Sequence, residues 1–273
     1  QSPDVPVVVE LSSWQLEFLG KGVRGPDVAI ITNLYEDHMN RYASMEEYAN
    51  AKANIFLGQT EGQVLFLNKS DKWTQFFLDK KPKAKVGFFS SLSEEDIVGV
   101  SVDFFRKYIV PQGFHNGSNF SAVALDAHTA GVSDEDIEER AKSLPVIAFR
   151  EEVVYEKDGV RVVNDTTATM PEATIAALRR FGDGGERLTL IAGGSDKELN
   201  FLNWAHEVKR YVRPDDLFLL AGDATDKMTK SLERVGYAES FQKFDNLEAA
   251  LKAAQASIAD GEKVIVVFSP GAT

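Results

Sequence analysis

The sequence contains no cysteine among its 273 residues. Disulfide bonds and thiolate metal sites are therefore excluded, and the composition fits a reducing compartment, so we expect a cytoplasmic protein. Long apolar runs are also lacking, because stretches such as Val264 to Phe268 are far too short to span a bilayer. No signal peptide is recognisable, and we expect no membrane interaction.

Basic charge is scarce relative to acidic charge: 30 Lys and Arg face 42 Asp and Glu, which gives a net charge of −12. A surface of this sign argues against a nucleic-acid partner. An acidic protein can still bind an anionic substrate, but only through local cations and helix N-termini. The apolar fraction of 44% and the charged fraction of 26% are typical of a globular protein, and the length suits two domains.

Short apolar strands alternate with amphipathic helices along the chain, which predicts a parallel α/β architecture. A change of pattern near residues 145–150 predicts a first domain over 1–147 and a second, doubly wound Rossmann-like domain over 148–273. The predicted strands are Val7 to Glu10, Val28 to Thr32, Val64 to Leu67, Val86 to Phe89, Leu188 to Ala192, Leu217 to Ala221, a short one near Phe241, and Lys263 to Phe268, with a hairpin over Glu152 to Val163. The predicted helices are Ser44 to Leu57, Asn116 to Ala130, Asp134 to Ser143, Pro171 to Arg180, Phe201 to Val212, Lys227 to Val235, and Leu247 to Ala259.

Local signals support several of these elements. Ser44 is placed to cap its helix, with Glu47 three residues further on, which is a capping-box pattern. Asp158-Gly159 is a strong hairpin-turn signal. Both ends of the chain indicate a fragment: it opens with Gln1 rather than methionine, and it stops at Thr273, directly after a strand where a helix is expected.

Two polar groups follow predicted strands in the first domain, where ligands of open α/β sheets bind. Glu10 ends its strand and suits Mg²⁺, which prefers hard oxygen ligands; the alternative is an ordinary strand-end glutamate before a polar turn. His38 follows the next strand, either as a metal ligand or substrate contact, or as a loop histidine bonded to Asp37 or to backbone.

Lys52 falls on the same face of its predicted helix as Tyr48, Ile55 and Phe56, so that a lysine interrupts an apolar stripe. Burial disfavours the ammonium form and lowers the pKa. A neutral amine can react with CO2 to give a carbamate, whose two oxygens can bind a metal. The alternative is a lysine that extends from the edge of the stripe to water.

Three further segments open helices or follow strands. Asn116 begins a helix where amides can hold a base or phosphate, or simply cap the helix. Asp165 follows a strand, where its carboxylate can take ribose hydroxyls. Lys197 follows Gly193 and Gly194 and can hold a carboxylate, although each of these segments also reads as an ordinary turn.

In order along the chain, these segments resemble the Mur ligase family, and the resemblance covers essentially the whole sequence. The matching motifs in the first domain are Glu10-Leu11-Ser12-Ser13, Asp37-His38 with Ser44 to Tyr48 and Ala51-Lys52, and Gly113 to Asn116. The motifs Asn164 to Thr169, Gly193 to Lys197 and Ser269 to Ala272 are similar to the D-glutamate-adding, MurD-type branch. The first domain is accordingly identified as part of a central ATP-binding domain, and the second as a slightly shortened amino-acid-binding domain.

The resemblance implies an ATP-dependent ligase of peptidoglycan synthesis. ATP phosphorylates UDP-N-acetylmuramoyl-L-alanine, D-glutamate attacks the acyl phosphate, and the protein is a monomer. Glu10 would bind one Mg²⁺ ion, and His38 and carbamylated Lys52 would hold a second; these three residues form the catalytic set. The remaining roles fall to Ser12 for the nucleotide-sugar substrate, to Asn116, Arg150 and Asp165 for ATP, and to Thr169 and Lys197 for the carboxylates of D-glutamate.

Two departures from the family pattern limit what the resemblance carries over. Thr167 stands where many MurD-type sequences have a lysine. The phosphate loop GxxGKT is absent, so we expect it upstream and expect the fragment itself to be inactive. The alternatives are a truncated, non-catalytic binding module, and a ligase like folylpolyglutamate synthetase, against which the Asn164 to Thr169 string argues.

Overall fold

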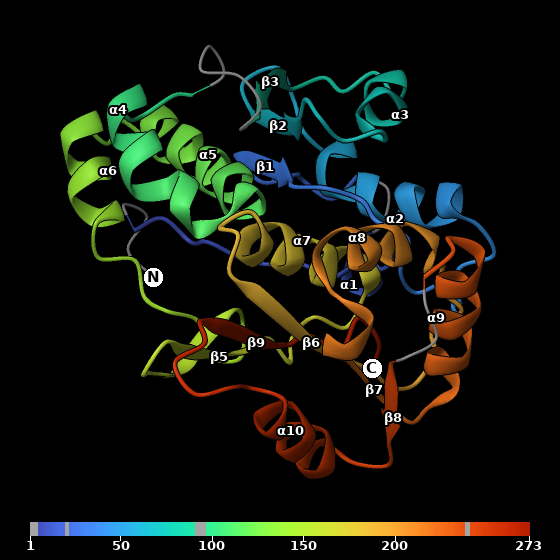
Figure 1. The fold of residues 1–273 in the computed structure, drawn as a ribbon. Coiled ribbons are helices and arrows are strands. Elements are labelled where there is room, and N and C mark those ends of the chain that lie inside the picture. The colour runs from blue at the N-terminus through green and yellow to red at the C-terminus, as the bar shows by residue number, and fades with distance from the viewer. Residues whose placement is uncertain (1–4, 20–21, 91–96, 238–240) are drawn as a thin grey trace. The chain divides into compact units, whose positions relative to one another are not determined.

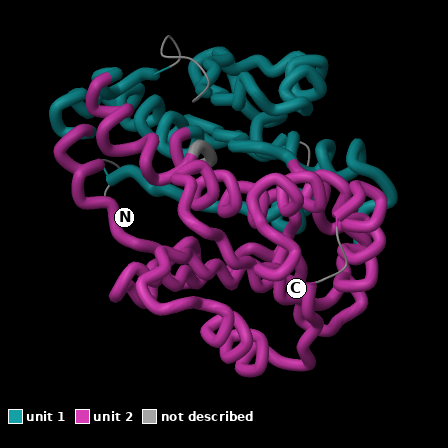
Figure 2. The backbone as a smooth tube through the Cα atoms, viewed as in Figure 1, with its two compact units in different colours: residues 1–34, 41–102, 118–137 teal, residues 35–40, 103–117, 138–273 magenta. Residues whose placement is uncertain are grey.

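The computed structural model describes residues 5–19, 22–90, 97–237 and 241–273. The chain forms two compact units, which Figure 2 shows in separate colours. Unit 1 comprises residues 1–34, 41–102 and 118–137, and unit 2 comprises 35–40, 103–117 and 138–273. Within the described ranges, no helix has both the length and the apolar character needed to cross a lipid bilayer.

The sheet of unit 1 is parallel, with the strand order β1-β2-β3. Its elements are β1 (Val28–Ile31), β2 (Val64–Asn68), β3 (Lys85–Phe89), α1 (Ser13–Glu17), α2 (Met45–Leu57) and α3 (Thr74–Asp79). Leu65 and Leu67 of the central strand are fully buried, as expected for a strand flanked by two others. This part of the predicted α/β architecture is confirmed.

The start of α2 shows how a local sequence signal sets a helix boundary. The Ser44 hydroxyl accepts a hydrogen bond from the Glu47 amide at 3.2 Å, as the capping pattern predicts. The Glu47 carboxylate, however, accepts from the amide of Ala43, at 2.7 Å, one residue before the cap. The helix therefore begins where predicted, although the second half of the box is shifted by one residue.

A run of helical segments links the strands of unit 1 to those of unit 2. These segments are α4 (Val102–Phe104), the π-helix η2 (Phe105–Ile109), the 3-10 helix η3 (Val110–Gln112), α5 (Phe114–Thr129) and α6 (Asp134–Ala141). Within unit 1, Ala122 and Leu125 of α5 pack against Phe66 and Phe89 of the sheet. The helices α5 and α6 agree with the predicted ones to within two residues, whereas the segments before Gly113 have no periodic sequence signal.

The sheet of unit 2 has the order β4-β5-β9-β6-β7-β8, and all neighbours are parallel except the β4-β5 hairpin. Its strands are β4 (Glu152–Lys157), β5 (Val160–Asn164), β6 (Arg187–Gly193), β7 (Leu217–Leu220), β8 (Gln242–Phe244) and β9 (Val264–Phe268). Asp158 and Gly159 have φ angles of 52° and 85°, and two positive angles are what a type I′ hairpin turn needs. The predicted hairpin is confirmed.

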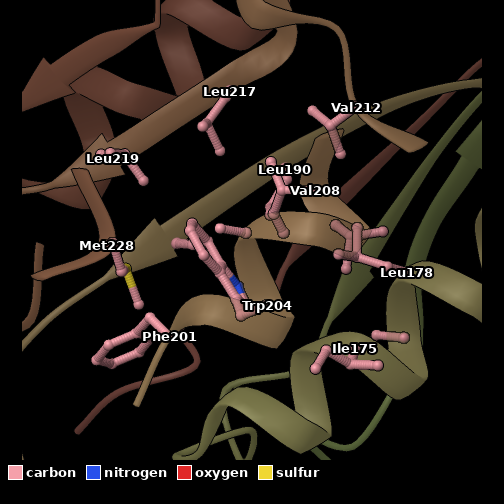
Figure 3. Close-up of a cluster of buried hydrophobic side chains, with 14 of the residues drawn as sticks. Ile175, Leu178, Leu190, Phe201, Trp204, Val208, Val212, Leu217, Leu219 and Met228 are labelled. Atoms are coloured by element: carbon pink, nitrogen blue, oxygen red, sulfur yellow. The ribbon is translucent and has the colours of Figure 1, made fainter. Parts of the chain in front are cut away.

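Helices cover both faces of this sheet (Figure 1). They are α7 (Pro171–Gly182), α8 (Leu202–Tyr211), α9 (Asp223–Arg234) and α10 (Leu247–Ala256), with the short 3-10 helix η4 (Pro214–Asp216) before β7. Leu190 packs with α7, α8 and α9 in a core around fully buried Trp204 (Figure 3). Ile191, the next residue in β6, packs instead with Ala250 and Ala254 of α10. This alternation confirms a doubly wound sheet with apolar residues on both faces.

One predicted element is wrong. Val7 to Glu10 form no strand: this segment is irregular and exposed, and Val8 is 91% accessible. Consecutive valines favour an extended chain, but a strand exists only where a neighbouring strand pairs with its backbone. Among the described residues no strand pairs with this segment, so Glu10 does not end a buried strand.

Candidate active site

Three loops meet at the carboxyl edge of the unit 2 sheet. They follow β5, β9 and β6, which are adjacent in the sheet. The Gly271 amide donates to the Ala168 carbonyl at 2.8 Å, and the Gly193 amide donates to the Pro270 carbonyl at 2.9 Å. Ser195 and Thr273 exchange two backbone hydrogen bonds. The motifs after these strands therefore form one continuous layer, at the edge where open α/β sheets bind ligands.

Thr169 and Lys197 lie together in this layer. The Lys197 ammonium donates to the Thr169 hydroxyl at 3.4 Å and lies 3.9 Å from a carboxylate oxygen of Asp37. The Lys197 side chain is only 24% exposed, so its charge is partly shielded from water. Pro171 occupies the first turn of α7, immediately after Thr169 and Met170. This arrangement places a cation beside a hydroxyl, and the role of the two residues in binding D-glutamate stays a prediction.

His38 lies in a loop and contacts Asp37, as in the alternative to a metal ligand that the sequence left open. Its backbone amide donates to one oxygen of the Asp37 carboxylate at 2.8 Å, and its Nε2 lies 3.4 Å from the other oxygen. Its φ angle of 59° is left-handed, which is uncommon outside glycine and often found at functional turns. Asp37 is buried, and its carboxylate contacts both His38 and Lys197.

Asp165 is buried rather than open to a ligand. One carboxylate oxygen accepts from the Glu151 amide at 3.0 Å, and the other accepts from the Ser269 hydroxyl at 2.7 Å. Ser269 also lies 3.1 Å from the hydroxyl of Thr174, which is fully buried. Asp165, which is predicted to bind ribose, therefore lies within a polar network that joins the loops after β5 and β9.

The two other residues predicted to bind ATP are Asn116 and Arg150. The Asn116 amide group donates to the Gln112 carbonyl at 2.8 Å and lies 3.5 Å from the Glu151 carboxylate. Arg150 is exposed, and its guanidinium makes no hydrogen bond or ion pair with another described residue. Arg150 is thus accessible to a ligand, whereas Asn116 already has partners in the protein.

Glu151 is a buried residue that sequence reasoning missed. It is 7% exposed, has a left-handed φ of 45°, and pairs with Arg180 at 2.5 Å. In the sequence, Glu151 is followed by a second glutamate, Glu152, and such a pair is typical of an exposed acidic turn. Only the fold shows that its backbone and side chain both take part in the network around Asp165 and Asn116.

The predicted site residues of unit 1 are Glu10, Ser12 and Lys52. Glu10 is exposed on an irregular segment. Ser12 is the N-cap of α1: its hydroxyl accepts from the Gln15 amide at 3.3 Å, and the Gln15 side chain accepts from the Ser12 amide at 2.8 Å. This helix was not predicted. Ser12 is nevertheless exposed, so a substrate can still reach it.

Lys52 lies on the face of α2 that the helical spacing predicts. Tyr48 and Phe56 on this face are buried, and Lys52 itself is half-buried. Its Nζ atom lies 5.5 Å from the centroid of the Tyr48 ring, a cation–π distance. A lysine therefore does interrupt the apolar stripe, which is the premise on which its predicted carbamylation depends.

An ion-pair cluster lies between α1 and α2 beside a pocket of about 470 Å³. The Arg41 guanidinium bonds to the Glu17 carboxylate at 2.6 Å, and the Tyr42 hydroxyl donates to the same carboxylate. Arg41 above all, and Tyr42 next, hold the pKa of the Glu17 carboxyl below its ordinary value. The cluster joins the last residue of α1 to the segment before α2, and it was not predicted.

The predicted metal ligands are divided between the two units. No group of three or more His, Cys, Asp or Glu side chains in the described ranges lies close enough to hold an ion. Glu10 and Lys52 belong to unit 1, whereas His38 belongs to unit 2. Their predicted role in metal binding therefore remains a prediction.

Comparison with known families finds matches over both parts of the chain. The model of the Mur ligase middle domain matches residues 5–126, and the model described as Mur ligase, glutamate ligase domain matches residues 149–271. The UDP-N-acetylmuramoylalanine--D-glutamate ligase of Roseiflexus sp. (strain RS-1) is 35% identical over 288 residues, covering 97% of this chain and 60% of that protein. The protein of the same name from Clostridioides difficile (strain 630) is 31% identical, covering 98% and 60%. The chain thus spans about 60% of the length of these relatives.

Solved structures show the same fold. MurF ligase from Thermotoga maritima in complex with ADP has a TM-score of 0.68 at 16% identity, over 91% of this chain and 59% of that one. MurC from Thermotoga maritima has a TM-score of 0.61 at 17% identity, over 96% and 58%. A bifunctional folylpolyglutamate synthase/dihydrofolate synthase from Yersinia pestis, complexed with AMPPNP and Mn ion, has 0.59 at 18% identity, over 90% and 59%.

Proposed function

The chain belongs to the Mur ligase family, and we propose that it forms the middle and C-terminal parts of an ATP-dependent ligase that adds D-glutamate to UDP-N-acetylmuramoyl-L-alanine. The observation that carries this proposal is the meeting of Lys197 and Thr169 in the part of the chain matched by the glutamate ligase model. The relatives that align over nearly the whole chain bear the name of this activity. The product is a precursor of peptidoglycan, made in the cytoplasm by a monomer.

In the proposed reaction, the carboxylate of UDP-N-acetylmuramoyl-L-alanine attacks the γ-phosphorus of ATP and ADP leaves. The amine of D-glutamate then attacks the acyl carbon, and inorganic phosphate leaves as the amide bond forms and the amine loses a proton. Lys197 and Thr169 hold the carboxylates of D-glutamate so that its amine faces the acyl phosphate. A protein with a net charge of −12 needs such a local cation to bind a dianionic amino acid.

The remaining roles are also part of the proposal. Ser12, exposed at the start of α1, contacts the nucleotide-sugar substrate. The residues that bind ATP are Asn116, Arg150 and Asp165. Of these three, Arg150 is the exposed one. The Asp165 carboxylate already accepts two hydrogen bonds from the protein. We therefore propose that it orients the loop after β5, in addition to any contact that it makes with ribose.

Two structural neighbours were solved with ADP or with AMPPNP and Mn ion, which supports the use of ATP and of a divalent ion; we propose Mg²⁺. Glu10 would hold one such ion, and His38 and carbamylated Lys52 would hold a second; the ions would offset the negative charge of phosphates. Glu10 and Lys52 belong to unit 1, and His38 belongs to unit 2.

No GxxGK[ST] phosphate loop occurs in the 273 residues. We propose that the chain alone neither hydrolyses ATP nor ligates substrates, and that the activity belongs to a longer protein. An assay of both proteins tests this point: ADP release that depends on UDP-N-acetylmuramoyl-L-alanine and D-glutamate should occur only with the longer protein. Equal turnover by the 273-residue chain would contradict it.

The second candidate function is glutamate addition to a folate, because a folylpolyglutamate synthase has the same fold. A substrate comparison with the longer protein decides between the two. The proposal expects product only with UDP-N-acetylmuramoyl-L-alanine and the D-isomer of glutamate. Product formed from a folate and L-glutamate instead would establish the alternative, and absence of turnover with either pair would favour a non-catalytic binding module.

A further inference from the structure

The loop that carries Lys197 is fastened to the N-terminal turn of α9. The Ala224 amide donates to the Gly194 carbonyl at 3.1 Å, and the Asp196 amide donates to the Asp223 carboxylate at 2.8 Å. Gly222 permits this approach, since a Cβ atom there would lie 2.1 Å from the Gly194 oxygen. The contacts with α9 therefore help to set the path of the loop, together with the backbone hydrogen bonds between Ser195 and Thr273.

A third contact comes from one turn further along α9. The Lys227 ammonium forms an ion pair with one oxygen of the Asp196 carboxylate, while the other oxygen accepts from the Leu199 amide at 3.2 Å. The Asp196 side chain is only 12% exposed, whereas that of Lys227 is 45% exposed. Each oxygen of the Asp196 carboxylate thus has a partner. Among the described residues, Lys227 is its only charged partner.

Asp196 is the residue immediately before Lys197, so its position determines where the Lys197 side chain begins. The backbone turns sharply just after it, since Glu198 has a left-handed φ of 64°. Asp196 also places a negative charge beside a site that must accept carboxylates. An ion pair that holds Asp196 in place and offsets its charge would therefore act on Lys197 in two ways at once.

We propose that Lys227 is a positioning residue for the amino-acid site: through its ion pair with Asp196 it holds the loop so that the Lys197 ammonium lies against Thr169 and meets an incoming dicarboxylic amino acid. This inference rests on the proposed function of Lys197. Lys227 itself does not contact the substrate. Its loss should weaken D-glutamate binding while leaving the nucleotide side of the enzyme unchanged.

The test is steady-state kinetics of the longer protein with Lys227→Gln and Lys227→Arg. Lys227→Gln should raise the KM for D-glutamate about twofold to fivefold, the size of effect expected from one ion pair with a half-exposed lysine. The KM for ATP should not change, and Lys227→Arg should restore most of the affinity for D-glutamate. Lys230→Gln is the matched control, because Lys230 is exposed on the same helix and has no ion pair with a described residue.

A double-mutant cycle separates this inference from the function on which it rests. Lys197→Ala alone reports on the proposed function: an unchanged KM for D-glutamate in that variant would overturn both proposals. If Lys197→Ala raises this KM but Lys227→Gln does not, only the role of Lys227 is overturned. If both act, Lys227→Gln should add little in the Lys197→Ala background; full additivity would show that Lys227 does not act through Lys197.

The charge component has its own test. Asp196→Asn removes the negative charge that Lys227 offsets. If repulsion of the substrate by Asp196 is the main effect of losing Lys227, the double variant Lys227→Gln/Asp196→Asn should recover affinity for D-glutamate. If loss of loop position is the main effect, the double variant should remain as weak as Lys227→Gln. A fall in kcat with unchanged KM in all these variants would contradict the inference.

Discussion

Lys197 donates a hydrogen bond from its ammonium to the hydroxyl of Thr169 across 3.4 Å, although 28 residues separate them in the sequence. The contact exists because β5 and β6 flank β9 in the sheet, so that the loops after them open on the same edge. Each residue alone belongs to an unremarkable turn. Together they form a cationic, hydrogen-bonding pair beside the N-terminus of α7, where an anion is favoured.

The first prediction concerns this pair. In the longer protein, Lys197→Ala should raise the KM for D-glutamate about tenfold to a hundredfold, because a charge-assisted contact contributes roughly 1.5–3 kcal/mol. The KM for ATP should change little. Steady-state kinetics with each substrate varied separately measure both values, and Lys243→Ala, at an exposed lysine of β8, is the control. A defect confined to ATP would show that Lys197 is misassigned.

The second prediction concerns Lys52. Lys52→Ala in the longer protein should abolish ligation while the fold is retained, since only one half-buried side chain of α2 is shortened. A short carboxylic acid added to the assay should restore part of the activity by replacing the carbamate. Carbon-13 NMR of the wild-type protein under labelled CO2 should show a carbamate signal that Lys52→Ala lacks. Lys72→Ala, at an exposed lysine, is the control. Near-normal turnover of Lys52→Ala would refute the proposed role of Lys52.

The third prediction concerns the buried network of Asp165, Ser269 and Thr174. Ser269→Ala removes the hydroxyl that donates to Asp165 at 2.7 Å. Removing one partner of a buried hydrogen bond typically costs about 1–3 kcal/mol, so the opening free energy of the β9 amides should fall by this amount. Native-state hydrogen exchange measures it. Ser143→Ala, at an exposed serine, should have almost no effect, and equal effects of the two variants would argue against the network.

Much of the fold follows from local sequence signals. Ser44 and the Asp158-Gly159 pair fix a helix start and a hairpin through backbone geometry that those residues favour wherever they occur. The segment Val7 to Glu10 shows the limit, because β-propensity describes a pleated surface that a neighbour must complete. The helix α1 was missed because its five residues are too few to show a period.

The site was predictable only in part, for a different reason. Lys197 and Thr169 follow strand ends, and strand ends of one parallel sheet converge, so their proximity follows from the α/β pattern. The partners of Asp165 do not follow from any pattern. Ser269 lies 104 residues away, and Glu151 looks like an exposed acidic turn; only tertiary packing shows that both bond to this carboxylate.

The fourth prediction concerns pH. Arg41 and Tyr42 lower the pKa of Glu17 in the folded chain. A carboxyl with a depressed folded pKa stabilises the fold above its unfolded pKa of about 4.3, and this contribution is lost as the pH falls through the folded value. Acid unfolding of unit 1 should therefore lose part of its pH dependence in Glu17→Gln. Glu46→Gln, at an exposed residue of α2, should unfold like the wild type.

The fifth prediction returns to the loop on α9. Gly222 has a φ of 162°, an extended conformation that any residue adopts, so backbone strain is not the reason for a glycine here. The reason is space: a Cβ atom would lie 2.1 Å from the Gly194 oxygen. Gly222→Ala must therefore push the loop away from α9, and overpacking of this kind costs about 1–3 kcal/mol.

Two measurements should change together in Gly222→Ala. The opening free energy of the Ala224 amide, which donates to Gly194, should fall, and the KM for D-glutamate should rise, because the loop that carries Lys197 has moved. Gly184→Ala is the matched control, since a Cβ there meets only a Glu186 side-chain oxygen at 4.0 Å. If Gly222→Ala lowers the opening free energy but leaves the KM for D-glutamate unchanged, the position of this loop on α9 does not determine how the amino acid is held.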